Sequence, residues 1–229
     1  ISTGLVGSEM CIRDRTKALT PPVKKKMAAL KPEELPEFLR RLEDYQGHRL
    51  TYLGMRFVIY TFVRTSELRL AEWKEFELKS ANPVWTIPAE RMKMRREHLV
   101  PLSKQAVQIL QQVAEISGGE RLVFPSQNNP NKPMSENTLL FAIYRMGYHS
   151  RATTHGFRSV ASTILNESEK WHPDAIERQL AHVESNKVRA AYDRAEHLPE
   201  RRRMMQWWAE HIDSLKQPAD VIDLEQQRA

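Results

Sequence analysis

The segment Thr154–Thr163, THGFRSVAST, places a histidine and an arginine at the start of an apolar helical stretch. His155 and Arg158 are three residues apart, and residues at this spacing share one face of a helix. One side chain can transfer a proton and the other is permanently cationic, so together they suit an anion such as a phosphate. Taken alone, the pair is explained as simply by an ordinary helix start with a surface arginine, so the remaining sequence has to decide.

The composition is that of a globular protein with a basic balance. The chain has 229 residues, of which 41% are hydrophobic and 28% charged, and a net charge of +6. A domain of this size buries enough surface to need no disulfide or metal for stability. The single cysteine, Cys11, excludes a disulfide framework and a thiolate zinc site within the chain. The positive charge favours a polyanionic partner without proving one.

No apolar run is long enough to span a bilayer, and the chain has no signal-peptide pattern. We therefore expect a protein of the bacterial cytoplasm, with no membrane partner.

The chain is expected to divide into four parts. Residues 1–15, ISTGLVGSEMCIRDR, match nothing downstream and resemble the translated read-through of a transposon end used in sequencing libraries. We expect an artefactual leader and a chain truncated upstream; a natural disordered terminus is the alternative. Residues 16–29 form a basic linker, 30–215 a globular domain, and 216–229 a polar tail.

Hydrophobic periodicity predicts a mainly helical domain. Leu35, Phe38, Leu39 and Leu42 share one stripe, and the segment 49–63 is apolar nearly all round, which predicts a buried helix. A short helix follows Arg64. Further helices are expected at 104–116, 135–146, 154–167, 173–182, 186–192 and 198–215. Segments 83–90 and 97–103 alternate apolar and polar residues around the basic turn RMKMRR, which predicts one small antiparallel sheet.

Five local contexts present a cation, a proton donor or a nucleophile. Glu67 lies three residues after Arg64 in RTSEL and can fix the arginine or the turn. Each residue has an ordinary structural explanation when taken singly; their joint order changes the interpretation. In chain order the side chains are Arg64, Lys93, His155 with Arg158, His182 and Tyr192.

This order resembles the catalytic domain of the tyrosine recombinases, in particular phage and satellite-phage integrases. The motifs are RTSEL, MKMRREHLVPLS, HGFR, LAH and VRAAYDRAE, and the resemblance covers about residues 30–215. It implies an α+β, mainly α, domain with a small antiparallel sheet packed against a helical core. Two departures are Phe62-Val63, where many members have Thr-Gly, and a His182–Tyr192 interval one residue longer than in many relatives.

The resemblance also implies a chemistry. Arg64 and Arg158 would neutralise a scissile DNA phosphate, because their planar forks match two oxygens. Tyr192 would attack to give a 3′-phosphotyrosine, without metal or ATP. His155 would accept the proton, Lys93 would protonate the leaving 5′-oxygen, and His182 would donate a hydrogen bond to the phosphate.

The expected partner is double-stranded DNA at attachment sites, bound by a homotetramer. Candidate backbone contacts are Lys24, Lys25, Lys26, Arg95, Arg96 and Arg151. Residues 201–203 are either a solvated helix face or further contacts. The segment 204–212, MMQWWAEHI, either packs in the core of its own domain or docks onto a neighbouring protomer.

Several alternatives stay open at this stage. His98, His149 and His172 are interpreted as surface or structural residues. Full-length relatives carry an upstream core-binding domain that this sequence lacks. A non-catalytic DNA-binding remnant and a type IB topoisomerase-like strand transferase are therefore the rival functions.

Overall fold

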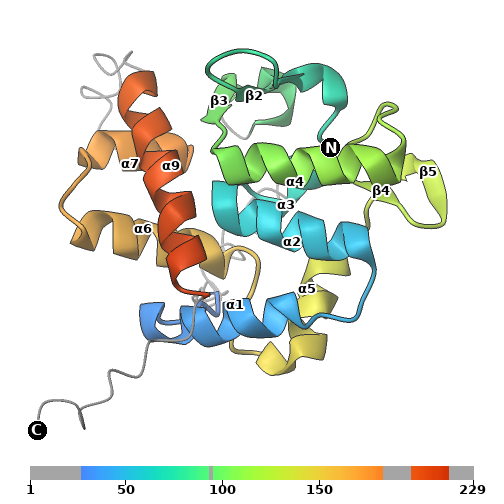
Figure 1. Ribbon diagram of the computed structural model, residues 1–229, viewed down its shortest axis with the longest axis horizontal. Coiled ribbons are helices and arrows are strands. Elements are labelled where there is room, and N and C mark those ends of the chain that lie inside the picture. The colour runs from blue at the N-terminus through green and yellow to red at the C-terminus, as the bar shows by residue number, and fades with distance from the viewer. Residues whose placement is uncertain (1–26, 93–94, 183–196, 217–229) are drawn as a thin grey trace, which may run out of the picture.

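The computed structural model describes residues 27–92, 95–182 and 197–216, and the prediction of a mainly helical domain with antiparallel strands is confirmed (Figure 1). The central helix α2 packs against α4, α5, α6 and α9. The helices are α1 (Leu35–Glu43), α2 (Arg49–Thr61), α3 (Thr65–Arg69), α4 (Lys104–Ser117), α5 (Thr138–Ile143), α6 (Gly156–Glu167), α7 (Pro173–Gln179) and α9 (Leu198–Ser214). Short 3-10 turns span Pro32–Glu34, Trp73–Glu75 and Ala89–Arg91.

The helices form where the periodicity predicts them. The stripe on α1 is buried, and almost every residue of α2 is buried as its apolar sequence predicts. Ser103 begins α4 by accepting a hydrogen bond from the Ala106 N–H at 3.2 Å. Gly118 ends α4 at φ 73, a left-handed conformation that glycine adopts without steric cost.

A three-stranded antiparallel sheet covers one end of α4 (Figure 1). Its order is β1 (Phe76–Glu77), β2 (Val84–Ile87), β3 (His98–Pro101), with Trp85 opposite Val100 and Ile87 opposite His98. Trp85, Ile87, His98 and Val100 are all buried, so one face of the β2–β3 hairpin belongs to the core. The hairpin thus anchors the basic turn to the helical body.

The prediction of one sheet was wrong, because a second sheet lies in the polar segment that follows. It pairs β4 (Pro125–Ser126) with β5 (Asn129–Pro133). This segment is built from Asn, Pro and Lys and has no apolar alternation. Its strands are held by their backbone ladder, which side-chain patterning does not reveal.

Several boundaries also differ from prediction. The helix expected at 135–146 is α5 followed by one π-helical stretch, Tyr144–Tyr148, broken at Gly147 with φ 88. Helix α6 starts at Gly156 and not at residue 154, while α2 ends at Thr61 and α7 at Gln179. The helix expected at 186–192 lies outside the described residues.

The last described helix, α9, belongs to the core of its own domain. Met204, Met205 and Trp208 are buried, and the Trp208 Nε1–H donates to the Ile59 carbonyl at 2.9 Å. Segment 204–212 therefore packs in cis, as one of the two alternatives predicted. Docking of a C-terminal segment onto a neighbouring protomer stays a prediction.

Within the three described stretches, no helix combines the length and apolar character that crossing a membrane requires. The same residues hold no group of three or more His, Cys, Asp or Glu side chains placed to bind a metal ion.

Candidate active site

Arg64 lies at the junction between α2 and α3, where it is fixed by Glu67. The backbone N–H of Arg64 donates to Glu67 Oε2 at 2.7 Å, and its Nη1 donates to Oε1 at 2.6 Å. Glu67 is buried, whereas the Arg64 side chain is 27% exposed. The carboxylate therefore does both things that the sequence predicted: it fixes the arginine and it closes the turn.

Arg158 meets Arg64 at the end of α7. The Arg158 side chain is buried, and its two Nη atoms donate to the carbonyls of Phe62 and Leu180. Arg64 Nη2 donates to the next carbonyl in the chain, that of Ala181, at 3.1 Å. The carbonyls of Leu180 and Ala181 belong to consecutive residues, so the guanidinium groups of Arg158 and Arg64 that donate to them lie close together. The two arginines are 94 positions apart in the sequence.

Two left-handed residues shape this arrangement. Phe62 ends α2 at φ 41 and Ala181 follows α7 at φ 48. Both turn the chain so that a carbonyl is presented to an arginine. A non-glycine residue in this region costs roughly 1 kcal/mol. Phe62 is fully buried in an edge-to-face contact with Trp208, at 5.9 Å between ring centroids, and this packing offsets the cost.

His155 stands immediately before α6 and is exposed, while Arg158 one turn later is buried. The pKa of His155 is lowered, first because part of the ring is shielded from water and then by the nearby charges of Arg158, Arg64 and His182. A neutral imidazole near two guanidinium groups is therefore the favoured state at neutral pH. It can accept a proton but does not add to the positive charge.

Steric crowding explains why the second residue of HGFR, Gly156, is a glycine. A Cβ at Gly156 would lie 2.6 Å from the Ala28 carbonyl oxygen and 2.8 Å from the Ala29 Cα. The chain before α1 therefore passes against the first turn of α6, and only glycine leaves room for it. The Thr153 hydroxyl also donates to the Ala28 carbonyl, at 3.0 Å.

His182 follows the end of α7, as predicted, and is exposed. Its Nδ1 lies 2.8 Å from Glu177 Oε2. His182 directly follows Ala181, whose carbonyl accepts a hydrogen bond from Arg64, so its backbone lies beside the arginine pair. Arg64, the HGFR residues His155 and Arg158, and His182 thus come together from three separate segments.

Positive charge is concentrated in this cluster. Burial and then the charge of Arg64 lower the pKa of Arg158 to about 10, while Glu67 and Glu177 oppose the shift. The Arg158 Nε is buried and has no hydrogen-bond partner in the described part of the chain. A buried N–H without a partner is unfavourable, and so is a concentration of positive charge. An anion beside the two arginines would relieve both.

The remaining candidates are only partly covered by the structure. Lys93, Tyr192, Lys24, Lys25 and Lys26 lie outside the described residues. Arg95 and Arg96 are exposed in the β2–β3 connection. Arg151 is exposed but pairs with Glu34 at 2.6 Å and lies over the Tyr148 ring, so part of its charge is already compensated.

Sequence reasoning missed three buried polar residues behind the cluster: His98, Gln179 and Arg201 are 5%, 1% and 0% exposed. The interpretation of residues 201–203 as a solvated face was therefore wrong for Arg201. A signal existed, because Arg201 falls on the apolar stripe of Met204, Met205 and Trp208, and His98 alternates with buried Val100. Polarity alone is thus a poor guide to the exposure of Arg201, while for His98 the structural interpretation is the one that holds.

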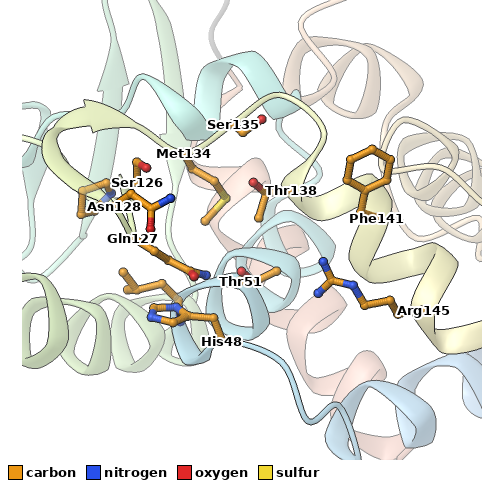
Figure 2. Close-up of a pocket in the computed structure, with 12 residues that line it drawn as sticks. His48, Thr51, Ser126, Gln127, Asn128, Met134, Ser135, Thr138, Phe141 and Arg145 are labelled. Atoms are coloured by element: carbon orange, nitrogen blue, oxygen red, sulfur yellow. The ribbon is translucent and has the colours of Figure 1, made fainter.

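A pocket of about 390 Å³ lies elsewhere, between the start of α2, the β4–β5 hairpin and α5 (Figure 2). His48, Thr51, Gln127, Thr138 and Arg145 are among its lining residues. Helix α2 has 13 residues and so extends about 20 Å. Because Arg64 follows the opposite end of α2, this pocket is separate from the arginine cluster.

Comparison with known proteins agrees with the geometry. The family model described as "Phage integrase family" matches residues 28–197. The chain is 45% identical over 215 residues to the integrase of Enterobacteria phage P4, covering 87% of this chain and 48% of that protein. It is 40% identical over 221 residues to the prophage integrase IntA of Escherichia coli K12, covering 96% and 52%. The chain thus spans about half the length of these relatives.

Solved structures show the same fold at low identity. The XerH recombinase bound to its difH substrate has a TM-score of 0.57 at 18% identity, covering 72% of this chain and 50% of that one. A lambda integrase dimer bound to a COC′ core site has a TM-score of 0.54 at 17% identity, covering 80% and 52%. From the motifs, the converging arginines and these matches, we conclude that the chain belongs to the phage integrase family and contains the tyrosine recombinase catalytic fold.

Proposed function

We propose that this domain carries out site-specific DNA recombination with Tyr192 as nucleophile, through a 3′-phosphotyrosyl intermediate and without metal or ATP. The observation that carries the proposal is the meeting of Arg64 and Arg158 at the consecutive carbonyls of Leu180 and Ala181. Family membership supports the same reaction class.

The arginine pair suits a phosphodiester in the state where charge builds up. Two preorganised guanidinium groups neutralise the non-bridging oxygens, and each such contact is typically worth a few kcal/mol in the transition state. The unpartnered Nε of buried Arg158 supplies a donor for an incoming oxygen. The pKa of Arg158 is lowered first by burial and then by the charge of Arg64, and a phosphate would oppose the second of these effects.

Proton transfers are assigned to the remaining motif residues. A phenol has an ordinary pKa of about 10, so Tyr192 must lose its proton in the attack. The lowered pKa of His155 keeps its imidazole neutral and able to accept that proton. His182 is proposed to donate a hydrogen bond to the phosphate, and Lys93 to protonate the leaving 5′-oxygen.

The substrate is proposed to be double-stranded DNA at attachment sites, recombined by a homotetramer. Two similar structures, those of XerH and lambda integrase, contain their DNA sites. Exposed Arg95, Arg96 and Arg151, together with the three lysines at 24–26, are proposed to contact the backbone. Such contacts make affinity fall with salt but read no sequence.

The test uses nicked duplexes that tile the transfer RNA gene nearest to the integrase gene, because the nick traps the covalent intermediate. The full-length wild-type protein should give an adduct that survives denaturing gels. Tyr192→Phe should abolish the adduct while the duplex is still retarded in a native gel. Tyr144→Phe, at a half-buried tyrosine distant from the motif, is the matched control and should keep the adduct.

Two outcomes would overturn the proposal. Retardation of DNA with no adduct in the wild type would identify a binding remnant. Relaxation of a supercoiled plasmid that lacks the attachment sequence, without exchange between sites, would identify a topoisomerase-like enzyme.

A further inference from the structure

Arg201 is a fully buried arginine on the fourth residue of α9, behind the arginine pair. Its Nε and Nη2 donate to Gln179 Oε1 at 3.0 Å and 2.8 Å. Nη2 also donates to the carbonyl of Leu99 in β3. One guanidinium group therefore joins α9, α7 and the β2–β3 hairpin.

Gln179 immediately precedes, in the sequence, the two residues whose carbonyls hold the two catalytic-site arginines. It is the last residue of α7 and is 1% exposed. The next two carbonyls, those of Leu180 and Ala181, accept from Arg158 and Arg64. Fixing the Gln179 side chain therefore fixes the backbone turn on which both guanidinium groups rest.

His98 is a third buried residue near Arg201 and that pair. It lies in β3 beside Leu99, is 5% exposed and is hydrogen-bonded to the Gln179 backbone. Burial, and then the charges of Arg201, Arg158 and Arg64 in that order, lower its pKa to about 3. A neutral imidazole thus lies near three cations and ties the strand to the same turn.

We propose that Arg201 is a positioning residue, which holds the Gln179–Ala181 turn of α7 against β3 so that Arg64 and Arg158 are presented together to the scissile phosphate. This inference rests on the proposed function and deepens it. By its place in the sequence, Arg201 also lies in the first turn of the helix that follows Tyr192, and the hairpin that it holds carries Lys93 in its turn.

The positioning role requires the planar, forked guanidinium group of arginine. Arginine donates several hydrogen bonds in fixed directions, so one side chain can hold an amide oxygen and a carbonyl at a set separation. Lysine carries the same charge but has no fork. Catalysis is sensitive to misplacement, and an error of about 1 Å in a catalytic group can cost roughly 100-fold in rate.

The test measures single-turnover formation of the covalent adduct at saturating nicked DNA, with the full-length protein. Arg201→Met should lower the cleavage rate roughly 10- to 100-fold, with less than a threefold change in DNA affinity. Arg201→Lys should be nearly as slow, because it lacks the fork. Arg69→Met is the matched control: Arg69 in α3 is 16% exposed and donates to a carbonyl, that of Met134 at 2.6 Å, and its ion-pair partner is Glu136, so its described polar partners lie outside α7.

A second substrate separates positioning from general loss of structure. Replacing the scissile phosphate by a methylphosphonate removes the charge that Arg64 and Arg158 neutralise. If Arg201 acts through that pair, its defect should shrink severalfold on this substrate, whereas a loosened fold would slow both substrates equally. Gln179→Met should reproduce the pattern, and the double variant should be no slower than the slower single variant.

The outcomes are distinguishable from those of the proposed function. No adduct in the wild type would remove the proposed function itself. An active wild type with an equally active Arg201→Met, or with the same fold-loss on both substrates, would overturn the positioning role alone. If Arg201→Met does not fold, Gln179→Met decides by the same two criteria.

Discussion

Replacement of Glu67 by glutamine tests whether a buried carboxylate holds the first arginine in place. Glu67 is 4% exposed and accepts from both the backbone N–H and Nη1 of Arg64. In Glu67→Gln, one of the two oxygens becomes an NH₂ group, so one of these two donors must face another donor. The residue keeps its size, which separates this effect from packing.

The structure sets the size of the expected loss. A buried donor left without its acceptor costs about 1–3 kcal/mol. The Arg64 side chain is 27% exposed, so solvent screens the lost charge attraction to at most about 1 kcal/mol. We therefore expect Glu67→Gln to lower the free energy of unfolding by about 1–4 kcal/mol. It should also lower the rate of adduct formation, because Arg64 loses an anchor.

Urea unfolding followed by tryptophan fluorescence gives the free energy, since the chain has five tryptophans. Glu136→Gln is the control: Glu136 pairs with Arg69 at 3.2 Å but is 80% exposed, so its loss should stay below about 0.5 kcal/mol. If the two variants lose equally little, Glu67 does not organise the turn and the reasoning about Arg64 fails.

Two further predictions concern the surroundings of the site. His98 has a pKa of about 3 in the folded state and about 6.5 when unfolded, so the unfolded chain binds the extra proton and the free energy of unfolding should fall as the pH drops from about 6.5 to 3. Urea unfolding of His98→Gln should show a clearly weaker dependence of this free energy on pH over the same range. An unchanged pH dependence would contradict the assignment. Gly156→Ala should lower the unfolding free energy by about 1–3 kcal/mol, because its Cβ would lie 2.6 Å from the Ala28 carbonyl oxygen; a thermal melt equal to that of wild type would show that the chain before α1 moves aside freely.

Local patterns were sufficient for most of the fold. The stripe on α1, the all-round apolar character of α2 and the Ser103 cap each depend on neighbours in sequence, and the structure confirms all three. The β4–β5 hairpin was missed because its strands carry no alternation of apolar side chains. Backbone hydrogen bonds between strands do not depend on side-chain type, so the amino-acid composition does not reveal them.

Motif order predicted which residues form the candidate site, but not which groups hold them in place. Motif order selected Arg64, His155 and Arg158, and the structure brings these residues together. Their supports, such as the carbonyls of Leu180 and Ala181, are backbone groups that any residue could supply. No side-chain pattern identifies them, because only the path of the chain decides which carbonyls face an arginine.

The departure at Phe62-Val63 follows from the same geometry. Many family members have Thr-Gly here, whereas in this chain Phe62 takes up the left-handed turn at the end of α2. This chain makes the turn with Phe62, whose ring packs on Trp208 of α9 while its carbonyl holds Arg158. The aromatic residue thus links Arg158 to α9, and Arg201 links that helix to α7. Both arginines are therefore held by turns that α9 supports, so displacement of α9 should disturb the placement of Arg64 and Arg158 before it unfolds the domain.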